Sequence, residues 1–211
     1  MFQRTIGLIM AAVMTLACTA CGQTSTQEEN GSSGLPESQS SRSETLSSTA
    51  GEQAPSVGGK TLVVYFTWSG NTEEMAAYIA DQVGGDLLEI EPREAYPSDY
   101  NETGEVAKVE RDENTRPEIA NLPASIDEYD TILIGYPIWW HTAPMIIGTF
   151  LESYDLTGVQ VYPFTQSASM DTEQFDNSVE FVRESAAGAT VHDGLFARPS
   201  DTAAIDAYLT E

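Results

Sequence analysis

Three short segments hold the side chains in this chain that are best suited to bind a ligand. They cover residues 67–72, 135–144 and 162–170, and each coincides with the end of an apolar run typical of a buried strand. Ligands of open α/β sheets bind at the carboxyl ends of the strands, near the point where the strand order reverses. These three segments are therefore the candidate site.

The first segment combines hydroxyl groups, a glycine and the start of a predicted helix, and it reads Thr67-Trp68-Ser69-Gly70-Asn71-Thr72. Such a turn favours an anion, because backbone N–H groups converge on it and the helix dipole adds positive potential. It contains no lysine, so it is not an ATP-binding P-loop, and it lacks the Gly-x-Gly-x-x-Gly pattern of a dinucleotide turn. A capped turn between a strand and a helix, with no ligand, is the alternative.

The second segment carries two adjacent tryptophans, Trp139 and Trp140, after Pro137 and Ile138. Aromatic side chains just beyond a buried strand either contact a flat ligand or cover the core, and both interpretations remain open. His141, which follows them, is either a hydrogen-bond donor to a ligand or a solvated loop residue.

Alternating strands and helices connect these segments. We predict strands at 61–67, 86–90, 132–135 and 159–162, with a split fifth strand at 190–191 and 195–196. Helices are predicted at 72–83, 145–153, 172–185 and 201–210. This alternation predicts an α/β fold with a parallel sheet covered on both faces.

The first segment and its strand, residues 63–72, resemble the phosphate loop of the flavodoxin family. Pro137, Trp140 and Pro144 also match the Pro-x-x-Trp-x-x-x-Pro spacing of FMN-dependent quinone reductases. Two further stretches, 96–100 and 116–119, resemble the long second crossover of flavodoxin-like lipoproteins. The resemblance implies a doubly wound, five-stranded parallel sheet over residues 60–211, with FMN as its cofactor.

The resemblance also implies roles for single residues. The phosphate of FMN would be bound by hydroxyls and amides of the first segment. The polar edge of the isoalloxazine ring would be bound by backbone amides of the loop that contains Pro137, Ile138, Trp139 and Trp140. Relatives carry a Thr-Ser-Gly-Gly-type loop in the third segment, where this chain has Gln166, Ala168 and Met170. Thr165, Gln166 and Ser167 can still supply hydrogen bonds to the ring.

The N-terminal part of the chain is expected to be an export signal and a tether. Residues 1–21 combine Arg4, an apolar run too short to span a membrane comfortably, and small residues. Cys21 lies in a stretch that resembles a bacterial lipobox and is the predicted lipidation site, with Cys18 as the alternative. Residues 22–59 are rich in Ser, Thr and Gly and predict a flexible tether.

Charge and cysteine content exclude several classes of function. The chain has 9 basic and 33 acidic residues and a net charge of −24. Binding to nucleic acid is therefore not expected, because phosphate binding needs clustered Lys and Arg. No cysteine follows Cys21, which leaves no thiolate metal site, internal disulfide or cysteine nucleophile in residues 22–211. With two histidines in the whole chain, no metal site is predicted.

We therefore expect an FMN-binding electron-transfer protein or reductase, lipid-anchored on the outer face of the cell membrane. Its partner would be a redox protein or a small quinone-like acceptor, and no catalytic acid or base is identified. One alternative is a flavin-free lipoprotein that binds another ligand with the same fold. A Ser-His hydrolase built on Ser69 is another, although the chain lacks the Gly-x-Ser-x-Gly elbow.

Overall fold

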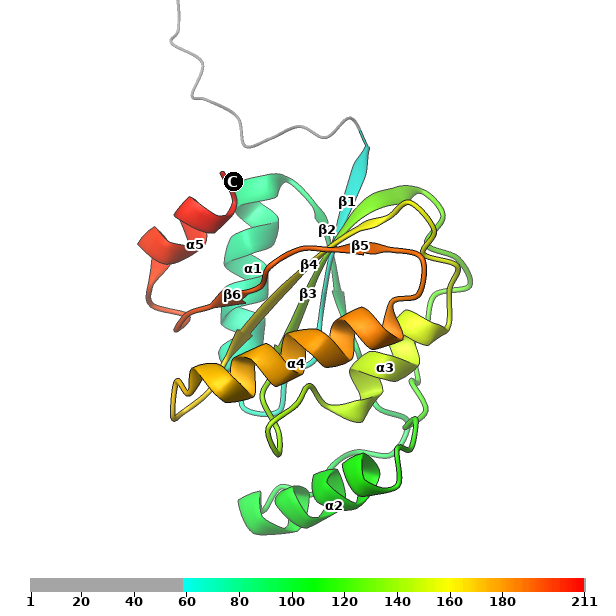
Figure 1. The fold of residues 1–211 in the computed structure, drawn as a ribbon, viewed down its shortest axis with the longest axis vertical. Coiled ribbons are helices and arrows are strands. Elements are labelled where there is room, and N and C mark those ends of the chain that lie inside the picture. Colours follow the sequence, from blue (N-terminus) through cyan, green and yellow to red (C-terminus); the bar gives the residue numbers. More distant parts are fainter. Residues whose placement is uncertain (1–58, 211) are drawn as a thin grey trace, which may run out of the picture. The chain divides into compact units, whose positions relative to one another are not determined.

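A parallel sheet forms the centre of the structure, a computed structural model that describes residues 59–210 (Figure 1). Its path runs β2-β1-β3-β4-β5, and β6 also pairs with β4. The strands are β1 (Lys60–Tyr65), β2 (Asp86–Glu89), β3 (Tyr129–Pro137), β4 (Gln160–Gln166), β5 (Thr190–Val191) and β6 (Leu195–Phe196). The helices are α1 (Asn71–Val83), α2 (Tyr100–Asp112), α3 (Met145–Glu152), α4 (Thr172–Ser185) and α5 (Thr202–Tyr208). The predicted signal peptide, the lipidation site and residues 22–58 of the predicted tether lie outside the described residues.

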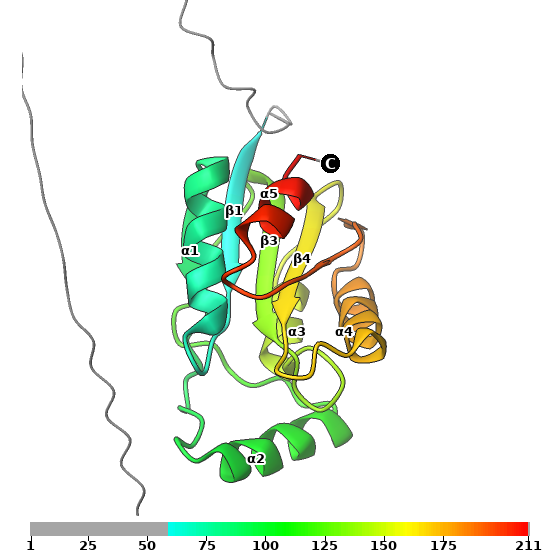
Figure 2. The same cartoon turned by 90° about the vertical axis from the view of Figure 1, so that its left-hand side faces the viewer.

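Both faces of the sheet are covered by helices, which confirms the predicted doubly wound fold (Figure 2). On one face, Met75 and Ile79 of α1 and Ile205 of α5 pack against the sheet. On the other face, the apolar side chains of α3 and α4 do so, including Phe150 and Val182. The strands in the middle are apolar on both faces because each face meets a helix layer.

The fifth strand is split, as predicted, into two short pieces that both pair with β4. Thr190 and Val191 pair with the start of β4, and Leu195 and Phe196 pair with Phe164 and Thr165 near its end. None of the helices between residues 59 and 210 is long and apolar enough to cross a lipid bilayer.

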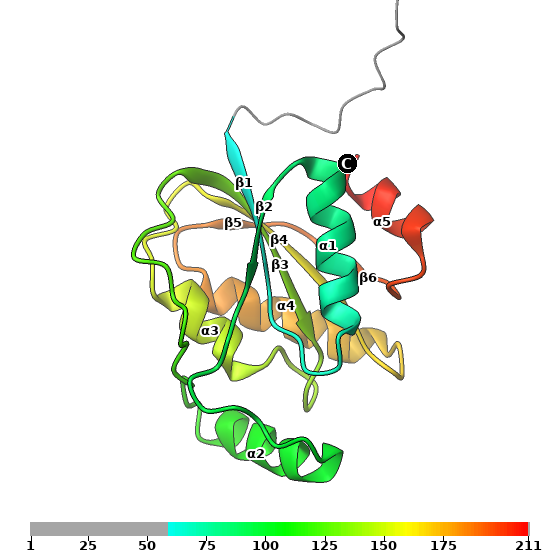
Figure 3. The same cartoon turned by 180° about the vertical axis from the view of Figure 1, so that it is seen from behind.

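Helix α2 was not predicted from the sequence. It lies in the connection between β2 and β3, beyond the carboxyl ends of the strands and apart from both helix layers (Figure 3). Its N-terminus is capped by Asp99, whose carboxylate accepts hydrogen bonds from the amides of Asn101 and Glu102. The connection that resembled a flavodoxin crossover thus contains a helix of 13 residues.

Candidate functional site

The three predicted segments meet at the carboxyl edge of the sheet. The amide of Phe66, at the end of β1, donates to the carbonyl of Gly135 in β3 at 2.9 Å. The amide of Ile138 donates in turn to the carbonyl of Gln166 at the end of β4, at 3.4 Å. β1 pairs with β2 on one side and with β3 on the other, so the strand order reverses between β1 and β3. A ligand of such a sheet binds beside this point.

The β1–α1 loop leaves the N-terminus of α1 open. Gly70 is the N-cap residue with a φ of 85°, and no side chain caps this helix. In contrast, α2, α4 and α5 each begin at an aspartate that accepts hydrogen bonds from first-turn amides. The hydroxyl of Thr67 accepts a hydrogen bond from the amide of Gly70 at 3.0 Å and closes the loop. The first-turn amides of α1 are therefore free to bind an anion.

Two hydroxyl groups add to this open helix end. Ser69 is exposed, whereas Thr72 is only 1% exposed, and within residues 59–210 neither hydroxyl makes a hydrogen bond. Asn71 is exposed at the first position of α1. Trp68 differs from these residues, because its indole N–H donates to the carbonyl of Pro97 at 3.0 Å. The available hydrogen-bond donors are thus hydroxyls and amides. Such donors can bind a phosphate group even though the loop has no cationic side chain.

The β3–α3 loop is a tight turn in a strained conformation. Trp139 and Thr142 exchange backbone hydrogen bonds of 3.0 and 3.1 Å across it. Trp140 and His141 between them have φ values of 47° and 65°, in the left-handed region. Such a conformation costs a non-glycine residue about 1–2 kcal/mol. Strain of this kind persists only where surrounding contacts hold the turn in place.

The two tryptophans of this loop have different surroundings. The ring of Trp139 packs edge-on against Phe66 and Tyr96, with centroids 5.3 and 5.0 Å apart, and it joins a core cluster. The ring of Trp140 lies on α2 and is 39% exposed. Both rings therefore have protein partners, and a flavin contact for either remains a prediction. His141 is exposed.

The β4–α4 loop is closed on itself. Thr165 is fully buried, and its hydroxyl donates to the carbonyl of Tyr136. The hydroxyls of Ser167 and Ser169 lie 3.0 Å apart, and Met170 adopts a positive φ of 51°. The side chain of Thr165 thus links β4 to β3 and does not face the site. Gln166 and Ser167 are half-buried at the site edge.

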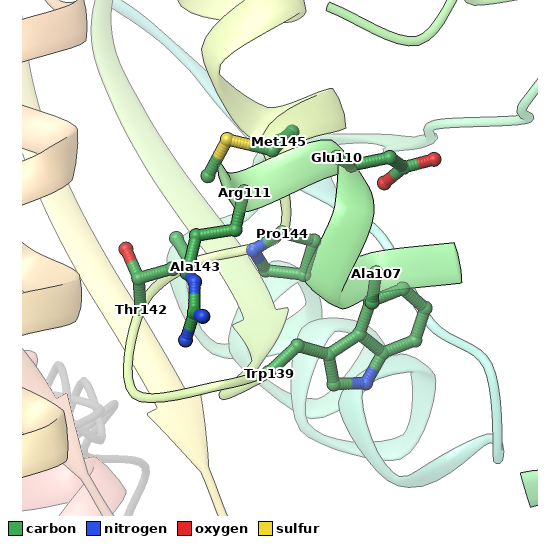
Figure 4. Close-up of a pocket in the computed structure, with 8 residues that line it drawn as sticks. All are labelled: Ala107, Glu110, Arg111, Trp139, Thr142, Ala143, Pro144 and Met145. Atoms are coloured by element: carbon green, nitrogen blue, oxygen red, sulfur yellow. The ribbon is translucent and has the colours of Figure 1, made fainter. Parts of the chain in front are cut away.

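A cleft between α2 and the β3–α3 loop was not foreseen from the sequence. Ala107, Glu110 and Arg111 of α2 line one side, and the other side is lined by Trp139 and residues 142–145 (Figure 4). It encloses no space that would hold a water molecule, whereas typical ligand pockets have volumes of roughly 300–1,000 Å³. We therefore regard it as a gap between helix and loop and not as the flavin site. The spacing Asp99-x-x-Glu102, a helix-start signal, could have revealed this helix.

Glu110 lies beside this cleft in an unusual environment. The hydroxyl of Tyr96 donates to its carboxylate at 2.9 Å. Burial nevertheless raises the pKa of Glu110 above its ordinary value of 4.5, although the Tyr96 hydrogen bond acts in the opposite direction. The carboxylate that connects α2 to Tyr96 is therefore easier to protonate than a solvated one.

We expect the variant Glu110→Gln to gain stability relative to the wild type as the pH rises above 4.5. Because the folded-state pKa of Glu110 is raised, the folded protein binds more protons than the unfolded chain between 4.5 and that raised pKa. The contribution of Glu110 to the free energy of unfolding therefore falls as the pH rises through this window. Urea unfolding of both proteins at a series of pH values measures the difference.

The variant Tyr96→Phe is the control for this prediction. It removes the donor that stabilises the carboxylate, so the pH window should extend upward. A difference between Glu110→Gln and wild type that does not change with pH would contradict the prediction.

Comparisons with known proteins agree with this geometry. Residues 60–207 match the family model described as flavodoxin. A Bacteroides eggerthii structure assigned to the flavoproteins is 36% identical, with a TM-score of 0.64, over 71% of this chain and 95% of that one. A second, from Bacteroides uniformis, is 33% identical with a TM-score of 0.65, over 72% and 99%.

A third structure is a flavoprotein from Lactobacillus acidophilus in complex with FMN. It is 28% identical with a TM-score of 0.60 and covers 71% of this chain and 98% of that one. The comparison with curated proteins found no match. The strand order, the open N-terminus of α1 and the match over residues 60–207 lead to one conclusion: this chain belongs to the flavodoxin family.

Proposed function

We propose that this chain is an FMN-binding electron-transfer protein that acts on the outer face of the cell membrane. The carrying observation is the open N-terminus of α1, at the strand-order reversal of a flavodoxin sheet. Flavodoxins have this strand order and bind FMN at this point. FMN is the cofactor, and when bound it accepts and donates electrons singly or in pairs.

The residues of the β1–α1 loop fit the phosphate group of FMN. Ser69 and Thr72 supply hydroxyls that have no partner among residues 59–210, and the amides of the first turn of α1 supply further donors. Position 70 favours glycine, because its φ of 85° lies in the left-handed region. An added Cβ there would have no neighbour nearer than the Glu73 carboxylate at 4.0 Å, so the loop surface is open.

The β3–α3 loop and the end of β4 would hold the isoalloxazine ring. The amides of Trp140 and His141 donate no hydrogen bond within residues 59–210, whereas the amide of Ile138 donates to the carbonyl of Gln166 and that of Trp139 to the carbonyl of Thr142. Pro137 is buried at the end of β3 and sets where this loop begins. These groups would orient the ring, and the net charge of −24 should lower its reduction potential.

Absorbance of the purified full chain tests the proposed cofactor. We expect a yellow protein whose extracted flavin is FMN by chromatography, or an apoprotein that takes up FMN in a titration. A colourless chain that binds no FMN would instead support the flavin-free binding lipoprotein.

The spacing of Pro137, Trp140 and Pro144 supports a reductase as the finer form of this function. Reduction of a quinone to a hydroquinone takes up two electrons and two protons. The reduced holoprotein should therefore be reoxidised by a soluble quinone in a stoichiometric, two-electron step. Reoxidation by a one-electron acceptor alone would point to electron transfer between proteins.

We expect the variant Cys21→Ser to move from the membrane fraction to the soluble fraction. The reason is that Cys21, after Ala20 and before a polar segment, is the proposed lipid attachment site. Fractionation and labelling with a fatty-acid analogue measure both effects, and Cys18→Ser is the matched control. If membrane retention and labelling were instead both lost in Cys18→Ser and kept in Cys21→Ser, the lipid would be on Cys18.

A further inference from the structure

Helix α2 is held to the domain by polar contacts more than by apolar packing. Of its 13 residues, Thr103 and Ala107 are buried. The shorter α3, with 8 residues, buries six. Because helices are usually positioned by an apolar face, the position of α2 depends to an unusual degree on its other contacts.

Those contacts converge on Trp140 in the β3–α3 loop. The indole N–H of Trp140 donates to the carbonyl of Gly104 at 2.5 Å, and the guanidinium of Arg111 donates to the carbonyl of Trp140 at 3.0 Å. The cations of Lys108 and Arg111 also lie over its ring, 5.5 and 5.6 Å from the centroid. Both the main chain and the side chain of Trp140 are therefore bound to α2.

The same region of the chain also contacts the β1–α1 loop. The carbonyl of Pro97, just before α2, accepts hydrogen bonds from the indole of Trp68 and from the hydroxyl of Thr103, at 3.0 and 2.6 Å. Tyr100 at the start of α2 packs edge-on against the ring of Trp68, with centroids 6.2 Å apart. The two loops of the candidate site thus share one support.

The turn that α2 contacts is one that needs support. Trp140 and His141 both have positive φ, although neither is a glycine. Without external contacts, such a turn would sample other conformations, and its amides would be ordered only when a ligand binds. Ordering a loop during binding lowers affinity, and a loop that is ordered beforehand avoids this loss.

We propose that α2 is a brace for the flavin-ring site and that Trp140 is its positioning residue. The indole of Trp140 binds α2, and α2 holds the β3–α3 loop in the strained turn that presents its amides to the ring. This inference rests on the proposed function, because it assigns the ring to that loop. It gives Trp140 an indirect role, in place of direct stacking on the flavin.

The variant Trp140→Phe tests the brace in the full chain. Phenylalanine keeps a ring beneath Lys108 and Arg111 but has no N–H to donate to Gly104. We expect faster amide hydrogen exchange in residues 138–143 of the apoprotein. FMN and riboflavin affinity should both fall by the same factor, about two- to tenfold for one hydrogen bond. Val109→Ala is the matched control, since Val109 is 51% exposed on α2 and should change neither measurement.

Each outcome of this experiment decides the proposal. Unchanged exchange at residues 138–143 would overturn the brace, and if flavin affinity alone fell, Trp140 would be a direct contact. Faster exchange with unchanged flavin affinity would show that the order of the turn does not affect flavin binding, and this result would also overturn the proposal. A wild-type chain that binds neither flavin would refute the proposed function. The exchange comparison in the apoprotein would still decide whether α2 holds the loop.

Discussion

Replacing Ser69 by alanine should weaken FMN binding while leaving riboflavin binding nearly unchanged. The hydroxyl of Ser69 is exposed at the open end of α1 and has no protein partner within residues 59–210. In the complex it would donate to the phosphate, and a charge-assisted hydrogen bond is worth on the order of 1.5–3 kcal/mol. The dissociation constant for FMN should therefore rise about 10- to 150-fold, as measured by fluorescence titration. Thr72→Val should have a similar effect.

Two comparisons make this result interpretable. Riboflavin has the same ring without the phosphate, so equal losses for both flavins would show that these hydroxyls do not hold phosphate. Thr190→Ala removes an exposed hydroxyl near the start of β4, at the opposite end of the sheet, and should leave both affinities unchanged. Melting of each apoprotein checks that the loop variants remain folded.

Replacing Trp139 by alanine should destabilise the apoprotein by about 3 kcal/mol. Its ring packs against Phe66 and Tyr96 and joins the core cluster beneath the β3–α3 loop. Removal of a core tryptophan costs roughly 3–5 kcal/mol, and a partly buried ring is expected near the lower end of that range. Urea unfolding of the apoprotein measures the loss directly.

Trp140→Ala is the matched variant for this measurement. The Trp140 ring is 39% exposed and contributes one hydrogen bond and contacts with two cations. Its removal should cost about 1–2 kcal/mol. If Trp139→Ala left apoprotein stability unchanged but altered flavin fluorescence, the ring of Trp139 would be covering the ligand and not the core.

The fold and the position of the turn at residues 67–72 were predictable because their signals are local. Short apolar runs such as residues 61–66 alternate with helical periods, and Gly84 marks the end of α1 with a positive φ. The six residues 67–72 are consecutive, so their types alone specify a turn that leads into a helix N-terminus. The parallel sheet then brings this turn to the carboxyl edge, as predicted.

Helix α2 was missed because its sequence carries little of the apolar pattern that reveals a helix. It buries only two small side chains, and the contacts that hold it come from residues far away in the chain. The hydrogen bond from Trp140 to Gly104, for example, joins residues 36 positions apart. No local pattern contains that information.

The sequence by itself determined the fold class, the turn at 67–72 that leads into a helix N-terminus, and the aromatic character of the loop at 139–140. It left two interpretations for the adjacent tryptophans, because neighbouring residues of one type give the same pattern whether they bind ligand or core. Only the tertiary structure separated them, since Trp139 meets side chains from two other connections of the sheet and Trp140 meets α2. The chain reverses between Trp139 and Thr142 through the strained turn at Trp140 and His141. Trp139 lies before this turn and Trp140 within it, so the two rings point into different surroundings.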